Sequence, residues 1–311
     1  MGISRQLIHF FFTPFIFYCL ILSANARAEP GYKPTGAAVK ANVFVFGPHP
    51  YSNPQDVFAD YEPIMRYLER KLPGTHFEIE TSKNYAEYEA KLAAQRFHFS
   101  LPNPYQTVFS LEHGYRVIAK MTPDDDFRGL IVTRVDNKIR SAQDLSGKTL
   151  CFPSATAVAA TMLPLLYLQE VQHISVKQDI HINYVGSQFS SMLNAYTGDA
   201  AACGTSTRFW RNWSQENPDK AKQMRVLWKT EALPHNAFIA RTDVDPKLAQ
   251  KVASVLAGMD KDKELDQLQF KVGQQHFEPA SNASYKPMQH FLIRYDQVIG
   301  LPPAIKIQNS K

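Results

Sequence analysis

Short apolar runs alternate with helical patterns along most of the chain. Residues 41–47 (ANVFVFG), 97–101 (FHFSL) and 148–152 (KTLCF) are rich in β-branched and aromatic residues, which is typical of buried strands. Between such runs, residues 57–72 carry apolar side chains at the spacing of one helix face, and residues 156–169 form a second helical run. Repeated strand–helix–strand patterns of this kind predict mostly parallel sheets with helices on both faces.

The pattern occurs in two successive sets, which predicts an α/β protein of two lobes crossed twice by the chain. The predicted first lobe comprises residues 41–129 and 235–311, and the second comprises residues 130–234. Helices are expected in the tail at residues 246–259, 263–272 and 285–298. Because open α/β sheets bind ligands at the carboxyl ends of their strands, we expect a site in the cleft between the lobes, closed by hinge motion.

The first 28 residues have a different pattern from the rest. Arg5 precedes an apolar run from Leu7 to Leu22, and small residues in two overlapping A-x-A sites follow, the second ending at Ala28. The run is short for a membrane span, which needs about 20 apolar residues. We therefore predict a secretory signal peptide, residues 1–28, cleaved after Ala28, with residues 29–40 as a flexible leader of a periplasmic protein.

The composition and motifs narrow the function classes. The chain has 34 Lys+Arg against 29 Asp+Glu and no basic run, so nucleic acid is not an expected partner. Nucleophile-elbow, zinc-protease, Walker and dinucleotide-binding motifs are absent from the sequence, and its 10 histidines are scattered. We predict a monomeric binding protein without enzyme activity, metal or cofactor.

Several stretches, in this order and spacing, resemble the phosphonate-type binding proteins of ABC transporters. Residues 100–105 (SLPNPY) resemble part of their first lobe, and 144–149 (DLSGKT) resembles the D-L-x-G-K that opens their second. Residues 185–201 and 234–241 (PHNAFIAR) are similar to a later second-lobe segment and to the returning hinge strand. The resemblance spans nearly all of the predicted mature chain. It implies a type II periplasmic-binding fold and a role in uptake or sensing, and we expect a small anionic ligand delivered to an inner-membrane ABC permease.

Departures from the family's pattern bear on the ligand. The family's S-T-S-G turn falls on residues 157–160, which are Ala-Val-Ala-Ala here, and its histidine after Gly-Ser falls near 187–188. The acids expected to meet a ligand amine are replaced by Thr205, Ser206 and Thr207. We therefore expect the same sequence positions to contact the ligand, but we do not carry over the family's specificity for phosphonates. We predict a phosphonate-like, phosphate-like or organic-acid ligand with an apolar or aromatic portion, in preference to an aminoalkylphosphonate.

Candidate ligand contacts follow the ends of the predicted strands. The helix start near Thr156 offers free backbone N–H groups and the positive end of a helix dipole, although Thr156 could equally serve as a helix cap. Capping or packing is likewise the alternative for the other candidates. The predicted contacts are His49, Tyr51, Tyr85, Asn103, Tyr105, Thr156, Ala157, Val158, Ser187, Gln188, Thr205, Ser206 and His235.

Two further features allow more than one interpretation. Arg128 could bind an anionic ligand, but a local ion pair with the adjacent acids 124–126 is favoured. Cys151 and Cys203 end neighbouring strands and form either a disulfide or two buried thiols, with a metalloid-binding thiol pair as a third alternative.

Two other functions compete with uptake. A protein of the same fold could report ligand occupancy to a sensor kinase in the inner membrane. An exported enzyme acting through Cys151 or Cys203 is the third hypothesis, and it requires a reactive thiol of low pKa.

Overall fold

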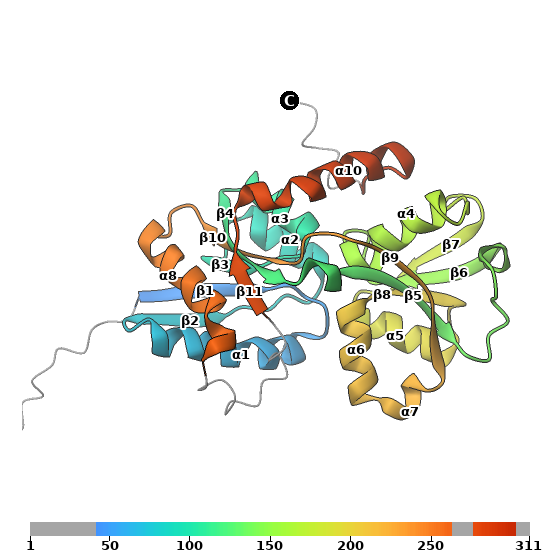
Figure 1. Cartoon of the computed structure of the whole chain (residues 1–311), viewed down its shortest axis with the longest axis horizontal. Helices are drawn as coiled ribbons and strands as arrows, with labels where there is room; N and C mark the ends of the chain where they lie inside the picture. Colours follow the sequence, from blue (N-terminus) through green and yellow to red (C-terminus); the bar gives the residue numbers. More distant parts are fainter. Residues whose placement is uncertain (1–41, 263–275, 303–311) are drawn as a thin grey trace, which may run out of the picture. The chain divides into compact units, whose positions relative to one another are not determined.

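The computed structural model describes residues 42–262 and 276–302 (Figure 1). The predicted signal peptide, the leader and the predicted helix at 263–272 lie outside the described residues. No helix within the described ranges has the length and hydropathy needed to cross a membrane.

The first of two sheets contains strands from both ends of the described chain. Its order is β11-β4-β10-β3-β1-β2. The strands are β1 (Asn42–Pro48), β2 (Thr75–Ile79), β3 (Phe99–Leu101), β4 (Tyr115–Thr122), β10 (Ala237–Arg241) and β11 (His276–Pro279). β1 pairs parallel with β2 and β3, whereas β10 and β11 pair antiparallel with their neighbours.

The second sheet is formed by the middle of the chain. Its order is β7-β6-β8-β5-β9. The strands are β5 (Arg128–Arg134), β6 (Lys148–Phe152), β7 (Ile180–Tyr184), β8 (Ala202–Ser206) and β9 (Met224–Ala232). β6 pairs parallel with β7 and β8, and β5 pairs antiparallel with β8 and β9.

The α/β fold class with two helix-flanked sheets is confirmed, but the sheets are mixed rather than mostly parallel. Parallel pairing is confined to β1 with its neighbours and β6 with its neighbours. The antiparallel strands β5 and β10 are those that follow a passage of the chain from one sheet to the other, after β4 and after β9. A strand that enters a sheet from the other sheet needs no crossover helix, so it is free to run in the opposite direction.

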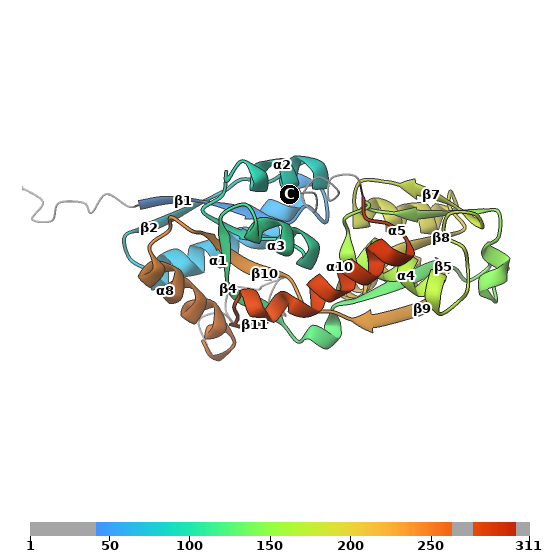
Figure 2. The ribbon, with the colours of Figure 1, turned by 90° about the horizontal axis from the view of Figure 1, so that it is seen from above.

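Helices cover both faces of each sheet (Figures 1 and 2). In the first sheet, α1 (Pro54–Lys71) and α8 (Pro246–Ala257) share one core with the strands. The opposite face packs against α2 (Tyr85–Ala93), α3 (Pro104–Leu111) and α10 (Lys286–Val298). In the second sheet, α4 (Leu163–Glu170) covers one face, and α5 (Gln188–Thr197) and α6 (Thr207–Glu216) cover the other. α10 contacts both α3 and α4 (Figure 2).

Shorter helical segments complete the described chain. They are η1 (Asp124–Asp126), η2 (Ala142–Leu145), the π-helical η3 (Val158–Met162), α7 (Pro218–Ala221), η4 (Met259–Lys261) and η5 (Asn282–Tyr285). The helix expected over 156–169 therefore begins as the π-helical turn η3 and continues as α4. Among the helices and strands, α6, α7 and β11 were not expected from the sequence pattern.

Candidate functional site

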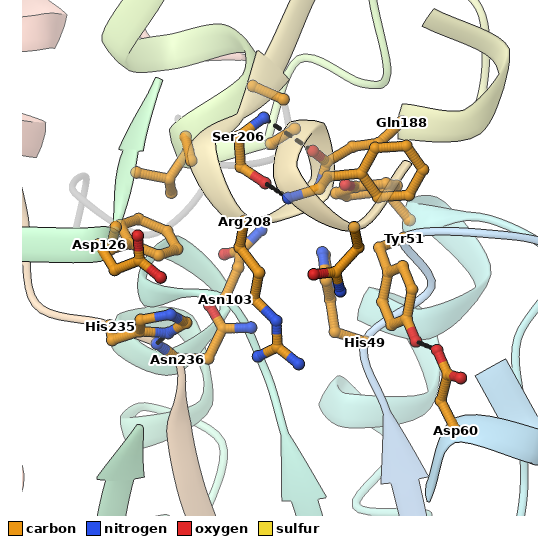
Figure 3. A pocket seen from close by; sticks show the side chains of 18 of the residues that line it. His49, Tyr51, Asp60, Asn103, Asp126, Gln188, Ser206, Arg208, His235 and Asn236 are labelled. Atoms are coloured by element: carbon orange, nitrogen blue, oxygen red, sulfur yellow. Dashed lines mark hydrogen bonds between the residues drawn. The ribbon is translucent and has the colours of Figure 1, made fainter. Parts of the chain in front are cut away.

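A cavity of about 90 Å³ lies where strands of both sheets end (Figure 3). Its wall is formed by residues that follow β1, β3, β6, β7 and β8 and by the two segments that connect the sheets. The lining residues are His49, Tyr51, Asp60, Tyr61, Tyr85, Asn103, Asp126, Phe127, Ala157, Val158, Ala159, Ala160, Gln188, Ser206, Arg208, Phe209, Asn212, His235 and Asn236. This position matches the rule that open α/β sheets bind ligands at the carboxyl ends of their strands.

One wall is the start of the helix formed by η3 and α4. Ala157, Val158, Ala159 and Ala160 all line the cavity. The helical hydrogen bonds begin with the N–H groups of Thr161 and Met162, which donate to the carbonyl of Ala157. The preceding N–H groups of a helix have no acceptor within it, and the helix dipole makes this end positive. The wall therefore offers backbone donors to an anion although its side chains carry no hydroxyl.

Arg208 supplies a cation to the same cavity. It lies in the first turn of α6, which Ser206 caps by accepting from the N–H of Phe209 at 3.2 Å. Its side chain extends into the cavity (Figure 3), and its Nη1 donates to the Sδ atom of Met121 at 3.7 Å. Within the described ranges, Arg208 forms no ion pair. Because a cation in the first turn of a helix is opposed by the helix dipole, its placement here favours a bound anion.

Two carboxylates line the cavity, and both are engaged by other residues. Asp126 accepts from both terminal nitrogens of Arg211, at 2.9 and 2.6 Å, and these hydrogen bonds lower the pKa of its carboxyl group. Asp60 accepts a hydrogen bond from the hydroxyl of Tyr51 (Figure 3). The sequence analysis considered acids only at Thr205–Thr207, where the chain has none. It did not single out Asp60, which reaches the cavity from α1.

Two buried histidines face the cavity in the neutral form. His49 and His235 are each 5% exposed. Burial lowers the pKa of His49 to about 4 and, with a contribution from nearby Arg208, lowers the pKa of His235 to about 3. Nδ1 of His49 lies 3.0 Å from Oε1 of Gln106, and Nδ1 of His235 lies 2.7 Å from the backbone nitrogen of Asn236. Neither ring adds charge at neutral pH.

We expect the protein to lose stability as the pH falls from about 6.5 to about 4. In the unfolded chain a histidine gains its proton near pH 6.5, while in the folded chain His49 does so only near pH 4 and His235 near pH 3. The unfolded state thus binds more protons in this window, so the free energy of unfolding falls with falling pH, by on the order of 3 kcal/mol for each ring. Urea unfolding across this pH range measures the loss. His49→Phe and His235→Phe should each flatten the slope, and an unchanged slope in both variants would contradict the assignment.

The cavity also holds polar groups without a protein partner. The hydroxyl of Tyr85 and Oδ1 of Asn236 are buried and accept or donate no hydrogen bond among the described residues. Tyr85 packs against Ala157 and Ala160 at the helix start. Buried polar groups without partners are costly, so a ligand that bonds to them would gain affinity. Beside them, the ring of Tyr51 contacts the rings of Tyr61 and Phe209 at centroid distances of 6.4 Å, which gives one side an aromatic surface.

The structure brings most of the predicted contacts together. Those that line the cavity are His49, Tyr51, Tyr85, Asn103, Ala157, Val158, Gln188, Ser206 and His235. Tyr105, Thr156, Ser187 and Thr205 are not part of its wall.

These four residues have structural contacts instead. Tyr105 packs beside Phe109 in the core, and Oγ of Ser187 caps α5 by accepting from the N–H of Ser190 at 3.1 Å. Thr205 donates to Oε1 of Gln188 at 3.2 Å, and so positions a residue that does line the cavity. Thr156 donates to Oε1 of Glu89 at 2.6 Å, and its carbonyl accepts from Nδ2 of Asn103 at 3.0 Å.

The sequence pattern missed the cavity residues that two helices contribute. Asp60 and Tyr61 come from α1, and Arg208, Phe209 and Asn212 come from α6. A signal for α6 was present: Ser206 is a favourable N-cap residue, and aromatic residues follow at 209, 210 and 213 with helical spacing. Recognising it would have placed Arg208 in a first turn directly after a strand end.

Arg128 and the two cysteines lie outside the cavity wall. Arg128 pairs with Asp125 at 2.9 Å and donates to the carbonyl of Thr230 at 3.1 Å, which is the local arrangement favoured from the sequence. Cys151 and Cys203 are partners in the pairing of β6 with β8, and the structure joins them by a disulfide with a Cα–Cα distance of 4.5 Å. In this state neither sulfur is a free thiol, so it offers no support to a cysteine-dependent enzyme.

Comparison with protein families gives one match over most of the chain. The model of a family described as the periplasmic substrate-binding protein of ABC phosphonate transporters matches residues 46–285. A similar curated protein is the phosphate-import protein PhnD of Mycolicibacterium smegmatis, which is 23% identical over 226 residues, or 67% of this chain and 69% of that protein.

Two solved structures share the fold of this chain over most of its length. One is a binding protein component of an ABC phosphonate transporter from Pseudomonas aeruginosa, with a TM-score of 0.75 and 13% identity over 83% of this chain and 88% of that chain. The other is PhnD1 from Prochlorococcus marinus in complex with methylphosphonate, with a TM-score of 0.74 and 16% identity over 84% of this chain and 100% of that chain. At these identities the likeness establishes the type II periplasmic-binding fold.

Proposed function

The chain belongs to the family of phosphonate-type periplasmic substrate-binding proteins of ABC transporters, and from this premise we propose that it captures a small oxyanion and delivers it to an inner-membrane permease. The observation that carries the proposal is the convergence of Arg208 and the start of the η3–α4 helix on one cavity. Both are positive, and among the described residues Arg208 forms no ion pair with a carboxylate. The periplasm is the proposed location, after removal of a signal peptide at Ala28.

Arg208 compensates for the hydroxyls that the sequence lacks at 157–160. A hydrogen bond to a charged group contributes about 1.5–3 kcal/mol, so the loss of serine and threonine donors alone would weaken the binding of a phosphonate. A guanidinium presents several donors in one plane and is suited to bidentate contact with phosphonate, phosphate or carboxylate oxygens. The cavity therefore suits phosphate and phosphonates as well as organic acids. The relatives named as a phosphate importer and solved with methylphosphonate support testing these two ligands first.

The rest of the ligand is proposed to be apolar or aromatic. The rings of Tyr51, Tyr61 and Phe209 form the side of the cavity on which such a group could pack. Asp60 is the carboxylate on this side, and the Tyr51 hydroxyl already donates to it. We therefore retain the preference for an apolar substituent over a primary amine.

Calorimetry on the purified mature protein tests both parts of the proposal. Phosphate, methylphosphonate, phenylphosphonate, aminoethylphosphonate and benzoate form the panel. We expect at least one phosphate or phosphonate to bind, and phenylphosphonate to bind more tightly than aminoethylphosphonate. Tighter binding of aminoethylphosphonate would refute the apolar substituent, and a panel without any binding anion would refute the ligand class.

A cellular assay separates transport from sensing. Deletion of the gene should abolish uptake of the radiolabelled ligand if the protein serves a permease. Normal uptake together with loss of a ligand-induced transcriptional response would instead indicate a partner of a sensor kinase.

A further inference from the structure

The hydrogen bonds around His49 determine which of its ring nitrogens carries the proton. Gln106 donates through Nε2 to Oε1 of Glu89 at 3.0 Å, and its Oε1 accepts from the backbone N–H of Asn103 at 3.2 Å. These two partners fix the orientation of the Gln106 amide, because a carboxylate only accepts and a backbone N–H only donates. Nδ1 of His49, 3.0 Å from the same Oε1, must therefore be the donor. In the neutral ring, Nε2 then carries a lone pair.

His235 is fixed in the opposite tautomer. Its Nδ1 lies 2.7 Å from the backbone nitrogen of Asn236, and an N–H donor requires a lone pair on the ring. The neutral ring consequently carries its proton on Nε2. Both rings are neutral at physiological pH, because burial lowers the pKa of each well below its ordinary value.

The two rings thus present complementary groups to one cavity. His49 and His235 both line it, and in each ring Nδ1 is occupied by a partner from the protein. No residue in the described ranges forms a hydrogen bond with either Nε2. His49 therefore offers an acceptor to a ligand, while His235 offers a donor alongside Arg208 and the helix N–H groups.

We propose that this pair of opposite tautomers makes the cavity select an oxyanion that retains a proton, such as a monoprotonated phosphonate or hydrogen phosphate, over an oxyanion that has none, such as a sulfonate. The inference rests on the proposed function and specifies the form of the ligand. A P–OH group can donate to Nε2 of His49. The other oxygens of the ligand can then accept from His235, from Arg208 and from the N–H groups of the helix start. A sulfonate of the same shape places a bare oxygen against the lone pair, so the buried acceptor stays without a partner.

Gln106 and Glu89 act as positioning residues in this scheme. Gln106 holds the proton of His49 on Nδ1, and Glu89 holds the Gln106 amide in the required orientation. Glu89 also accepts from Thr156, the residue before the helix start, so the same carboxylate accepts from Gln106 in α3 and from the segment that leads into η3.

Calorimetry with methylphosphonate and methanesulfonate tests the selection, at a pH below the second pKa of the phosphonate so that both are monoanions. We expect methylphosphonate to bind about 10- to 100-fold more tightly, the range for one hydrogen bond to a charged group. Equal affinities would overturn the inference and leave the proposed function intact. Failure of both to bind, together with failure of phosphate, would overturn the proposed ligand class and the inference with it.

Two matched variants and a direct observation complete the test. His49→Phe should remove the discrimination by weakening methylphosphonate alone, whereas His235→Phe should weaken both anions and preserve their ratio. The ¹⁵N chemical shifts of histidine-labelled wild-type protein report the tautomers without any substitution. They should show the proton on Nδ1 of His49 and on Nε2 of His235, and the reverse assignment for His49 would overturn the inference even if the variants fail to fold.

Discussion

Replacement of Arg208 by methionine is expected to weaken binding of the cognate oxyanion by roughly two to three orders of magnitude. Loss of one partner from a buried, hydrogen-bonded charge pair costs about 2–5 kcal/mol, and each 1.4 kcal/mol is about tenfold in affinity. Methionine keeps a long side chain in the cavity, so the change removes the charge and the donors with little change in volume. Stability of the ligand-free protein should not fall, because a cation in the first turn of α6 is opposed by the helix dipole.

Calorimetry and urea unfolding on the same preparations measure the two effects. Arg208→Lys retains the charge but not the planar fork, and it should recover only part of the affinity. Lys222→Met removes a charge of the same sign from an exposed site, where the side chain of Lys222 is 76% exposed, and should bind like the wild type. Wild-type affinity in Arg208→Met would show that the anion is held elsewhere.

The parts of the site that follow strand ends could be predicted because local sequence determines them. His49, Asn103, Gln188 and Ser206 each come directly or shortly after an apolar run that forms a strand. In an α/β fold these positions converge whatever the details of packing, since neighbouring parallel strands end at one edge. The same argument predicted that Thr205 contacts the ligand, but Thr205 does not line the cavity. Successive side chains of a strand point to opposite faces, and within β8 it is Ser206 that reaches the cavity wall.

Residues contributed by helices could not be placed in the same way. Asp60 lies in the interior of α1. Whether its side chain faces solvent, the sheet or the cavity depends on how α1 packs on the first sheet. The local sequence pattern also could not predict the direction in which each strand runs. A short apolar run predicts a strand but not its orientation, and the antiparallel entry of β5 and β10 follows from the passage of the chain between two sheets.

The positions of the backbone donors at 158–160 depend on two glycines that the sequence pattern did not single out. A Cβ atom on Gly129 would lie 2.3 Å from the carbonyl oxygen of Ala159, and a Cβ atom on Gly204 would lie 2.0 Å from that of Ala160. The first turn of the η3–α4 helix therefore packs with its backbone directly on β5 and β8. The absence of side chains at these two strand positions is what lets the helix start reach the cavity wall.

Gly204→Ala is accordingly expected to reduce both stability and ligand affinity. The added methyl group would also lie 2.5 Å from the ring of Phe152, so the strand cannot yield on that side. Overpacking of this kind costs about 1–3 kcal/mol, and we expect the upper end of the range because the opposing atom belongs to the backbone of a helix. Relief requires displacement of the turn that carries the Val158–Ala160 donors, so the affinity for the oxyanion should fall at least about tenfold in protein that is still folded.

Gly258→Ala provides the matched control for this prediction. Gly258 ends α8 far along the chain, and a Cβ atom there would lie 3.4 Å from the nearest atom, the carbonyl oxygen of Ser254, at ordinary contact distance. It should change the free energy of unfolding by less than about 0.5 kcal/mol and leave ligand binding unaltered. Urea unfolding and calorimetry on both variants separate the two consequences at Gly204. If Gly204→Ala lost stability but bound the oxyanion with wild-type affinity, the backbone donors of the helix start would not be the groups that hold it, and Arg208 with His235 would have to carry the anion alone.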